Sequence, residues 1–165
     1  MDTSKRVRMD IERYERASQS GRCFICAMLA GEPRFRHHLL YEDTETIAFL
    51  SRYPTLPGYS LVAPRRHAES WVRDLSAAQF LAFQAVVRNV AVALETVLPT
   101  ERMYSLSLGS QQGNSHLHWH LAPLPPGVPY ARQQYHALMA EHGVLEVSEE
   151  QQAQLAARIR RALAA

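Results

Sequence analysis

The sequence lacks several features that define whole classes of protein. Its only two cysteines are Cys23 and Cys26, too few for a disulfide-rich secreted scaffold. No uninterrupted apolar run reaches the roughly 18 residues that span a bilayer, and the first residues lack the apolar core of a signal peptide. The formal charge of +2 is too small to attract nucleic acid or a membrane surface by bulk electrostatics. We therefore expect a cytoplasmic protein that binds neither.

What remains is an ordinary globular composition. The 165 residues are 47% hydrophobic and 21% charged, which favours one domain with a substantial core. There is no internal repeat and no linker long enough to divide the chain. We expect a single domain over residues 1–165.

Three histidines alternate with apolar residues in the stretch His-Leu-His-Trp-His-Leu at positions 116–121. Residues two apart share one face of a β-strand, so the pattern predicts a strand with a histidine face and an apolar face. The apolar face needs a core behind it, and the histidine face then looks into a cleft or out to water. Pro123 should end the strand because it cannot donate to a ladder.

Imidazole can act as a nucleophile, as an acid or base, or as a metal ligand near neutral pH. A polar strand face without any chemistry is the alternative interpretation. A single histidine would favour that alternative, but clustered ionisable groups in register favour a functional site.

Periodicity and helix breakers predict the other elements. We expect helices over residues 4–19, 77–98, 130–141 and 149–163, and a knuckle with a short helix over residues 23–29. Ser76 and Ser148 each open a capping-box pattern. We expect strands over residues 39–41, 46–50, 59–63 and 102–108, with Pro64 ending the third. A polar turn over residues 109–115 then joins strand 102–108 to the histidine strand as a hairpin.

Residues 116–122 resemble the motif of the histidine triad (HIT) family, His-φ-His-φ-His-φ-φ with φ apolar. The segment 46–67, with its Pro-Gly turn and Leu-Val-x-Pro-x-x-His ending, resembles the strand–loop–strand unit of that family. The cysteine pair resembles the knuckle of zinc-containing members, and the resemblance covers about residues 22–127. It implies an α+β fold, a mainly antiparallel five-stranded sheet packed with a long helix, usually as a homodimer. The helices over 4–19 and 130–163 would be additions.

The resemblance also implies nucleotide chemistry. Members cleave at the α-phosphorus of nucleotidyl conjugates, such as nucleoside phosphoramidates or dinucleoside polyphosphates, through a covalent nucleotidyl-histidine intermediate. Carried onto this chain, His118 is the nucleophile and the carbonyl of His116 keeps its second ring nitrogen protonated. His120 then binds the phosphate oxygens or the leaving group. The expected substrate is an adenosine or other purine nucleotide, and the acceptor is water or inorganic phosphate.

The same resemblance suggests further nucleotide contacts. The polar turn offers Gln111 or Gln112 to the phosphate, and Gln112 is favoured because the family often has glutamine four residues before the first histidine. Ser51 stands where an acidic or amide residue commonly holds the ribose. Gly113 and Leu124 replace residues that could contact phosphate in many members. The candidates for the base pocket, with ordinary core packing as the alternative, are Phe24, Ile25, Ile47 and Phe49.

A Cys2His2 set completes the resemblance to the zinc-containing branch. Its members are Cys23, Cys26, His67 and His116. Thiolates and imidazoles suit a tetrahedral zinc site. We expect a structural zinc that ties the knuckle to the sheet and fixes His116; the alternative is two buried or redox cysteines and a surface His67. The histidines without patterned context, expected to be solvated or loosely packed, are His37, His38, His136 and His142.

Two other functions stay open. In a metallohydrolase, all three triad histidines would hold one catalytic metal. In a non-catalytic module, the same fold would bind a nucleotide or a partner without turnover, and the departures at Ser51, Gly113 and Leu124 favour this interpretation.

Overall fold

The computed structural model describes residues 5–19, 21–111 and 113–165. Its helices and strands are, in chain order, β1 (Arg6–Val7), α1 (Ile11–Ser18), α2 (Phe24–Leu29), η1 (Pro33–Phe35), β2 (Leu39–Glu42), β3 (Thr46–Leu50), β4 (Ser60–Pro64), α3 (Ala77–Val97), β5 (Arg102–Leu106), β6 (Trp119–Leu124), η2 (Tyr130–Arg132), α4 (Tyr135–Leu138), η3 (Ala140–His142), β7 (Val144–Leu145) and α5 (Glu149–Leu163).

Five of these strands form one antiparallel sheet in the order β2-β3-β4-β6-β5. The predicted α+β architecture, with a five-stranded antiparallel sheet and a long helix, is therefore confirmed. The pairing of β5 with β6 is the predicted hairpin around the polar turn. β1 and β7 form a separate two-stranded ribbon, which the sequence did not indicate.

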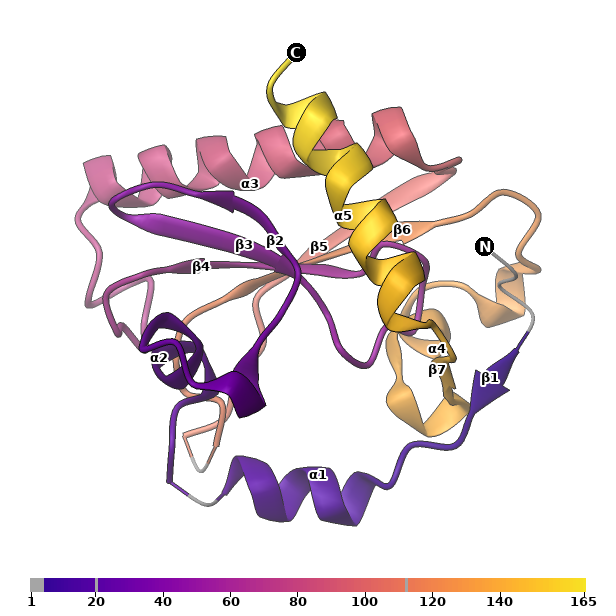
Figure 1. Ribbon diagram of the computed structural model, residues 1–165, viewed down its shortest axis with the longest axis horizontal. Helices are drawn as coiled ribbons and strands as arrows, with labels where there is room; N and C mark the ends of the chain where they lie inside the picture. The colour runs from indigo at the N-terminus through magenta and orange to yellow at the C-terminus, as the bar shows by residue number, and fades with distance from the viewer. Residues whose placement is uncertain (1–4, 20, 112) are drawn as a thin grey trace.

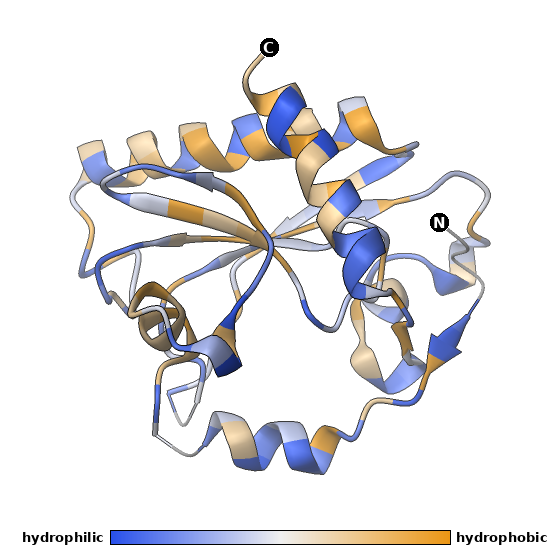
Figure 2. Cartoon of the chain, in the orientation of Figure 1, coloured by the Kyte–Doolittle hydropathy of each residue, from blue (hydrophilic) through white to orange (hydrophobic). Residues whose placement is uncertain are grey.

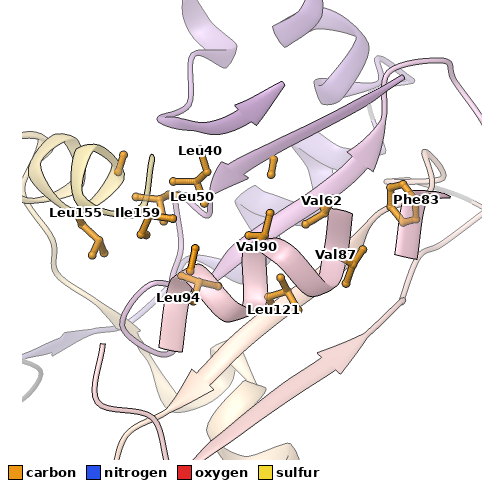
Figure 3. Packing of buried hydrophobic residues seen from close by; sticks show 13 residues of the cluster. Leu40, Leu50, Val62, Phe83, Val87, Val90, Leu94, Leu121, Leu155 and Ile159 are labelled. Atoms are coloured by element: carbon orange, nitrogen blue, oxygen red, sulfur yellow. The ribbon is translucent and has the colours of Figure 1, made fainter. Parts of the chain in front are cut away.

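Helices α3 and α5 cover one face of the sheet, and α2 lies on the opposite side (Figure 1). On the α3 face, Leu50, Val62 and Leu121 from three strands pack with Val90 and Leu94 of α3 and with residues of α5 (Figure 3). Burying each such side chain stabilises the fold by about 1.5–3 kcal/mol relative to leaving it exposed. This layer is the main core.

Both long helices begin as the sequence predicts. Ser76 and Gln79 form a capping box at α3, and Ser148 and Gln151 form one at α5. Each box satisfies backbone N–H groups that a helix start would otherwise leave without partners. The starts of the two helices that build the core are therefore encoded locally.

The second face of the sheet is also covered. Ile47, Phe49, Leu61 and Ala63 pack there against Ile25 of α2. All residues of β3 and β4 are buried, because they lie between helices on both faces. This explains why each strand contains a continuous apolar run, Ile47–Leu50 in β3 and Leu61–Ala63 in β4, instead of an alternating pattern.

Helix α3 is the one helix among the described residues that is long and apolar enough to cross a membrane. The finding rests on length and composition. In the structure, its buried residues pack into the core between the sheet and α5: Phe83, Val87, Val90, Ala93 and Leu94. We interpret α3 as the core helix of the domain.

The predicted boundaries of the histidine strand are wrong at both ends. β6 begins at Trp119 because the backbone N–H of Leu117 donates to the carbonyl of Ala68, outside the sheet. The strand also continues through Pro123, which is opposite Met103 of β5. β4 pairs with β6 only as far as Leu121, so the missing N–H of Pro123 breaks no ladder bond on that side.

The structure corrects four other predictions. Pro64 lies inside β4, opposite Thr46, beyond the residues that pair with β6. The helix expected over 130–141 is divided into η2, α4 and η3, since Gln134 has a φ of +53° and interrupts the helical path. The expected helix over 4–19 is reduced to α1, because Arg6 and Val7 pair with β7 instead. Strand β5 ends two residues before the predicted 108, at Leu106.

Candidate functional site

Within residues 118–121 the alternation separates two faces, whereas His116 precedes β6 and its ring lies with Cys23 and Cys26 instead of beside His118 and His120. Trp119 contacts Phe83 on the α3 side, with ring centroids 5.6 Å apart, and Leu121 belongs to the main core. On the opposite side, the His118 ring lies 4.7 Å from that of His120 and 6.4 Å from that of Phe24 in α2. The structure therefore brings two triad histidines together beside α2.

His118 has one ring nitrogen fixed by the backbone. Its Nδ1 lies 2.6 Å from the carbonyl oxygen of His116. A carbonyl can only accept, so Nδ1 carries the proton and Nε2 keeps its lone pair. Burial lowers the pKa of His118, while the hydrogen bond to His116 opposes this shift. The geometry thus holds a neutral imidazole with one unprotonated nitrogen, which is the form required of a nucleophile.

His120 has a partner that sequence analysis missed. The hydroxyl of Tyr59 lies 3.1 Å from its Nδ1, and the two rings meet edge to face at 5.7 Å. Burial lowers the pKa of His120 to about 3 and raises the pKa of Tyr59 to about 12. Both groups are therefore neutral near pH 7. The position of Tyr59 directly after the Pro-Gly turn was the available signal, but nothing local marks a tyrosine as a partner of a distant histidine.

A second residue that was missed is His37, which is not loosely packed as expected. Its ring lies 4.9 Å from Phe49 and 5.9 Å from Phe24, and its Nδ1 donates to the carbonyl of Phe35 at 2.7 Å. Burial lowers the pKa of His37 to about 4. His37 and Phe24 thus extend the aromatic surroundings of His118.

The predicted base-pocket residues separate into two groups. Ile25 and Ile47 are fully buried in the core under α2, and so is Phe49, although its ring contacts that of His37. Phe24 is only partly buried and contacts the ring of His118. Phe24 is therefore the one of the four that the structure places beside the triad.

The polar residues predicted to contact the nucleotide are Ser51, which follows β3, and the two glutamines of the polar turn. The Ser51 hydroxyl accepts from the backbone N–H of Tyr53 at 3.2 Å. Gln111 is exposed in the polar turn. Gln112, the favoured phosphate donor, lies outside the described residues.

Helix α1 lies against the polar turn that leads to the triad. The Asn114 amide donates to the Tyr14 hydroxyl at 2.8 Å, and the Tyr14 ring packs on Tyr53 at 5.8 Å. A Cβ atom on Gly113 would lie 2.9 Å from the carbonyl oxygen of Ser18. Only glycine therefore fits at this position while α1 is docked.

Leu124 is the second residue that departs from the family pattern, and it too has a defined place in the structure. Leu124 is fully buried at the end of β6, in a small cluster with Leu56, Ala122 and Ala137. Its side chain belongs to the core. The structure therefore gives position 124 a packing role.

Four residues are gathered as a candidate metal centre: Cys23, Cys26, His67 and His116. All their ligand atoms lie within 4.8 Å of one another. The Sγ–Nδ1 distances are 3.3 Å from Cys23 to His116, 3.3 Å from Cys26 to His67 and 3.6 Å from Cys26 to His116. Zinc bonds of about 2.3 Å to sulfur and 2.0 Å to nitrogen at a tetrahedral angle place S and N about 3.5 Å apart. The donor set and its spacing therefore fit a tetrahedral zinc ion.

The surroundings of this centre orient its imidazoles. His116 Nε2 donates to the carbonyl of Pro64 at 2.8 Å, and His67 Nε2 lies 3.4 Å from the Glu69 carboxylate. Such partners fix the ring whose other nitrogen faces a metal. Burial and the neighbouring Cys23 raise the pKa of Cys26 to about 11, a direction that a bound dication would reverse.

A family model described as the HIT domain matches residues 32–126. An uncharacterized HIT-like protein of Saccharolobus solfataricus is 28% identical over 104 residues, which are 61% of this chain and 73% of that protein.

Solved structures of other proteins share the fold, among them the following three. A hypothetical histidine triad nucleotide-binding protein of Sulfolobus tokodaii has a TM-score of 0.69 at 22% identity, covering 86% of this chain and 92% of that chain. A Zn-bound histidine triad family protein of Mycobacterium smegmatis has a TM-score of 0.67 at 21% identity, covering 89% and 95%. A diadenosine triphosphate hydrolase of Plasmodium falciparum has a TM-score of 0.57 at 16% identity, covering 75% and 74%.

Proposed function

The chain belongs to the histidine triad (HIT) family, and from that premise we propose that it is a nucleotide hydrolase or transferase acting at the α-phosphorus of nucleotidyl conjugates. Members of the family bind nucleotide substrates, and one structural neighbour is a diadenosine triphosphate hydrolase. The observation that carries the proposal is the 2.6 Å hydrogen bond from His118 Nδ1 to the carbonyl of His116. It leaves His118 Nε2 unprotonated and available to attack phosphorus.

The reaction then proceeds in two displacements. His118 Nε2 forms a bond to the α-phosphorus as the bond to the leaving group breaks, giving a nucleotidyl-histidine. Water or inorganic phosphate attacks the same phosphorus in the second step, and the bond to His118 breaks. Each step transfers one nucleotidyl group, and the ring of His118 returns to its starting form.

His120 supports both steps through its second nitrogen. We infer that the Tyr59 hydroxyl, 3.1 Å from His120 Nδ1, donates to that nitrogen, which leaves the proton of the neutral ring on Nε2. That N–H can donate to a phosphate oxygen or to the departing group. His120 therefore needs Tyr59 to hold the correct tautomer.

The substrate must also reach His118, which is only 5% exposed in the state described. Helix α1 is mainly hydrophilic (Figure 2) and has no buried residue. Its Tyr14 hydroxyl accepts a hydrogen bond from the Asn114 amide of the polar turn. We propose that α1 moves aside to admit the nucleotide, with Phe24 and His37 beside the base.

The metallohydrolase alternative requires His116 to share a metal with His118 and His120. Its Nδ1 is within 3.6 Å of both cysteine sulfurs, and its Nε2 donates to Pro64. Neither nitrogen is left to bind a metal at the other two histidines. The geometry instead favours a structural zinc on the Cys2His2 set, which would tie α2 and the loop after β4 to the histidine segment and fix the His116 carbonyl.

The family resemblance further suggests a cytoplasmic homodimer. Within the described residues, β5 is an edge strand whose neighbour in the sheet is β6, so its outer edge is available for pairing. Light scattering of the purified protein decides the oligomeric state, and a monomer would refute the dimer.

The test of the function is turnover of adenosine phosphoramidate and of a dinucleoside polyphosphate, each with and without inorganic phosphate. Release of AMP indicates hydrolysis, and a nucleoside diphosphate formed only with phosphate indicates phosphorolysis. His118→Ala should abolish turnover, whereas the control His38→Gln, at a residue paired with Glu149, should keep it. Nucleotide binding without turnover by the wild-type protein would support the non-catalytic module instead.

A further inference from the structure

A second concave site lies away from the triad and the Cys/His cluster. This cavity of about 590 Å³ is formed by β1, by the loop before β4 and by the segment from residue 125 to β7. None of its lining residues belongs to the histidine triad or to the candidate metal centre. Its volume lies in the range of about 300–1,000 Å³ that is typical of small-molecule sites.

The cavity has an apolar floor and a basic rim. Leu56, Ala137 and Leu145 are buried and form apolar lining, together with a run of prolines and a valine in segment 125–129. The charged or titratable lining residues are all basic in type: Arg6, Arg132, His136 and His142. No carboxylate is among the lining residues of the described chain. This combination suits a ligand with an apolar body and an anionic group.

Two features fix this rim in place. The Arg6 guanidinium donates to the carbonyls of Gly143 and Thr55, both at 2.8 Å, which holds its plane across the wall and leaves further N–H groups for a ligand. The rings of His136 and His142 are stacked at 3.8 Å with an angle of 6°, so two sets of ring nitrogens lie side by side.

Two carboxylates lie close to the lining residues, Glu101 through its contact with Gly127 and Glu146 next to Leu145 in the chain. Glu101 accepts from the backbone N–H of Gly127 at 3.2 Å, and Glu146 is paired with Lys5. Within the described residues, neither carboxylate forms an ion pair with a basic residue of the rim. Guanidinium groups recognise phosphate oxygens in a planar, bidentate geometry, and imidazoles add further donors.

We propose that this cavity is a second ligand site, which binds a small phosphate monoester carrying an apolar or aromatic body. The phosphate lies at the rim between Arg6, Arg132 and the stacked histidines. The body of the ligand covers the apolar floor. The site is independent of turnover at His118.

The probe for this proposal is phenyl phosphate, titrated into the full-length protein and into His118→Ala. Binding is followed by NMR of the side-chain nitrogens of His136 and His142. Both signals should shift in both proteins, because the cavity does not include the triad. Inorganic phosphate should bind several-fold more weakly since it cannot use the floor, and neutral phenol should leave the signals in place.

Matched arginine variants complete the test. Arg132→Gln should weaken the binding of phenyl phosphate about tenfold or more, because it removes a charge-assisted hydrogen bond. Arg88→Gln, at an exposed position on α3, should leave the affinity unchanged. The proposal is overturned by histidine signals that do not respond, by binding that disappears in His118→Ala, by equal binding of phenol, or by an affinity that Arg132→Gln does not change. Equal affinity for inorganic phosphate would refute the role of the floor.

Discussion

Replacing Tyr59 by phenylalanine removes one hydroxyl from the candidate site and leaves the ring in place. That hydroxyl lies 3.1 Å from His120 Nδ1, in surroundings buried enough to raise the pKa of Tyr59 to about 12. The substitution leaves a buried ring nitrogen without its partner. In the proposed arrangement it also removes the donor to Nδ1 that favours the tautomer with its proton on Nε2.

The size of the effect follows from the hydrogen bond. A buried polar group left without a partner costs about 1–3 kcal/mol. If that cost appears when His120 donates to the phosphate or to the leaving group, kcat falls roughly 5- to 150-fold, at about 1.4 kcal/mol per factor of ten. KM should change little, because Tyr59 acts on His120 rather than on the ground-state substrate.

The assay is steady-state hydrolysis of adenosine phosphoramidate by the wild-type protein, Tyr59→Phe and Tyr135→Phe. Tyr135 is 80% exposed, so its variant controls for loss of a tyrosine hydroxyl as such. An unchanged kcat in Tyr59→Phe, or a change confined to KM, would refute the proposed role of Tyr59 in orienting His120.

Three further predictions follow from other parts of the structure. Cys26→Ala should lower zinc well below one ion per chain and reduce stability by several kcal/mol, measured by metal analysis and thermal unfolding; wild-type protein without zinc would contradict the metal assignment. Gly113→Ser should displace α1, because its Cβ would meet the Ser18 carbonyl at 2.9 Å, at a cost of about 1–3 kcal/mol to docking. Faster amide exchange in α1 measures this, with Gly109→Ser as the control whose Cβ would have its nearest contact at 3.4 Å; equal exchange in the two variants would count against the docked arrangement. Stability should fall on acidification, because burial lowers the pKa of His37 to about 4 and of His120 to about 3. Between about pH 6.5 and 4 the unfolded chain binds protons that the folded chain does not, so the free energy of unfolding falls by up to about 1.4 kcal/mol per pH unit for each histidine. Denaturant unfolding at several pH values tests this, and His37→Gln should make the slope shallower; a flat profile would show that these rings titrate normally.

Much of the fold could be predicted because its signals are local. The capping boxes at Ser76 and Ser148 mark the starts of α3 and α5, and the apolar run Ile-Ala-Phe-Leu of β3 indicates a strand buried on both faces. The ends of strands were less predictable, since they depend on where the neighbouring strand stops pairing. Pro64 and Pro123 remain within strands because the adjacent strand has already diverged at those positions.

The candidate site also contains residues that the sequence predicts and residues that only tertiary structure reveals. The triad and the Cys2His2 set follow from spacing and from the family motif; the structure gathers the four Cys2His2 side chains and places the rings of His118 and His120 side by side. Tyr59 and His37 reach the triad through tertiary contacts, over 61 residues in the case of Tyr59 and His120. No periodic pattern in the sequence predicts a contact between residues so far apart.

Gly113 illustrates a residue whose meaning changes once the structure is known. In the sequence it is a lost phosphate contact relative to the family motif. In the structure it is the point where the backbone of Ser18 approaches too closely for any side chain. The composition of the polar turn therefore reflects the docking of α1, an element that lies outside the residues matched to the HIT domain.

The central claim is that His118 carries the nucleotidyl group during turnover. Its most direct test is rapid quenching of the protein during turnover of adenosine phosphoramidate, followed by mass spectrometry of the intact chain and of its peptides. The account predicts one added adenylyl group, on His118, that is absent from His118→Ala. Turnover with no adduct, or with the adduct on a different residue, would contradict it.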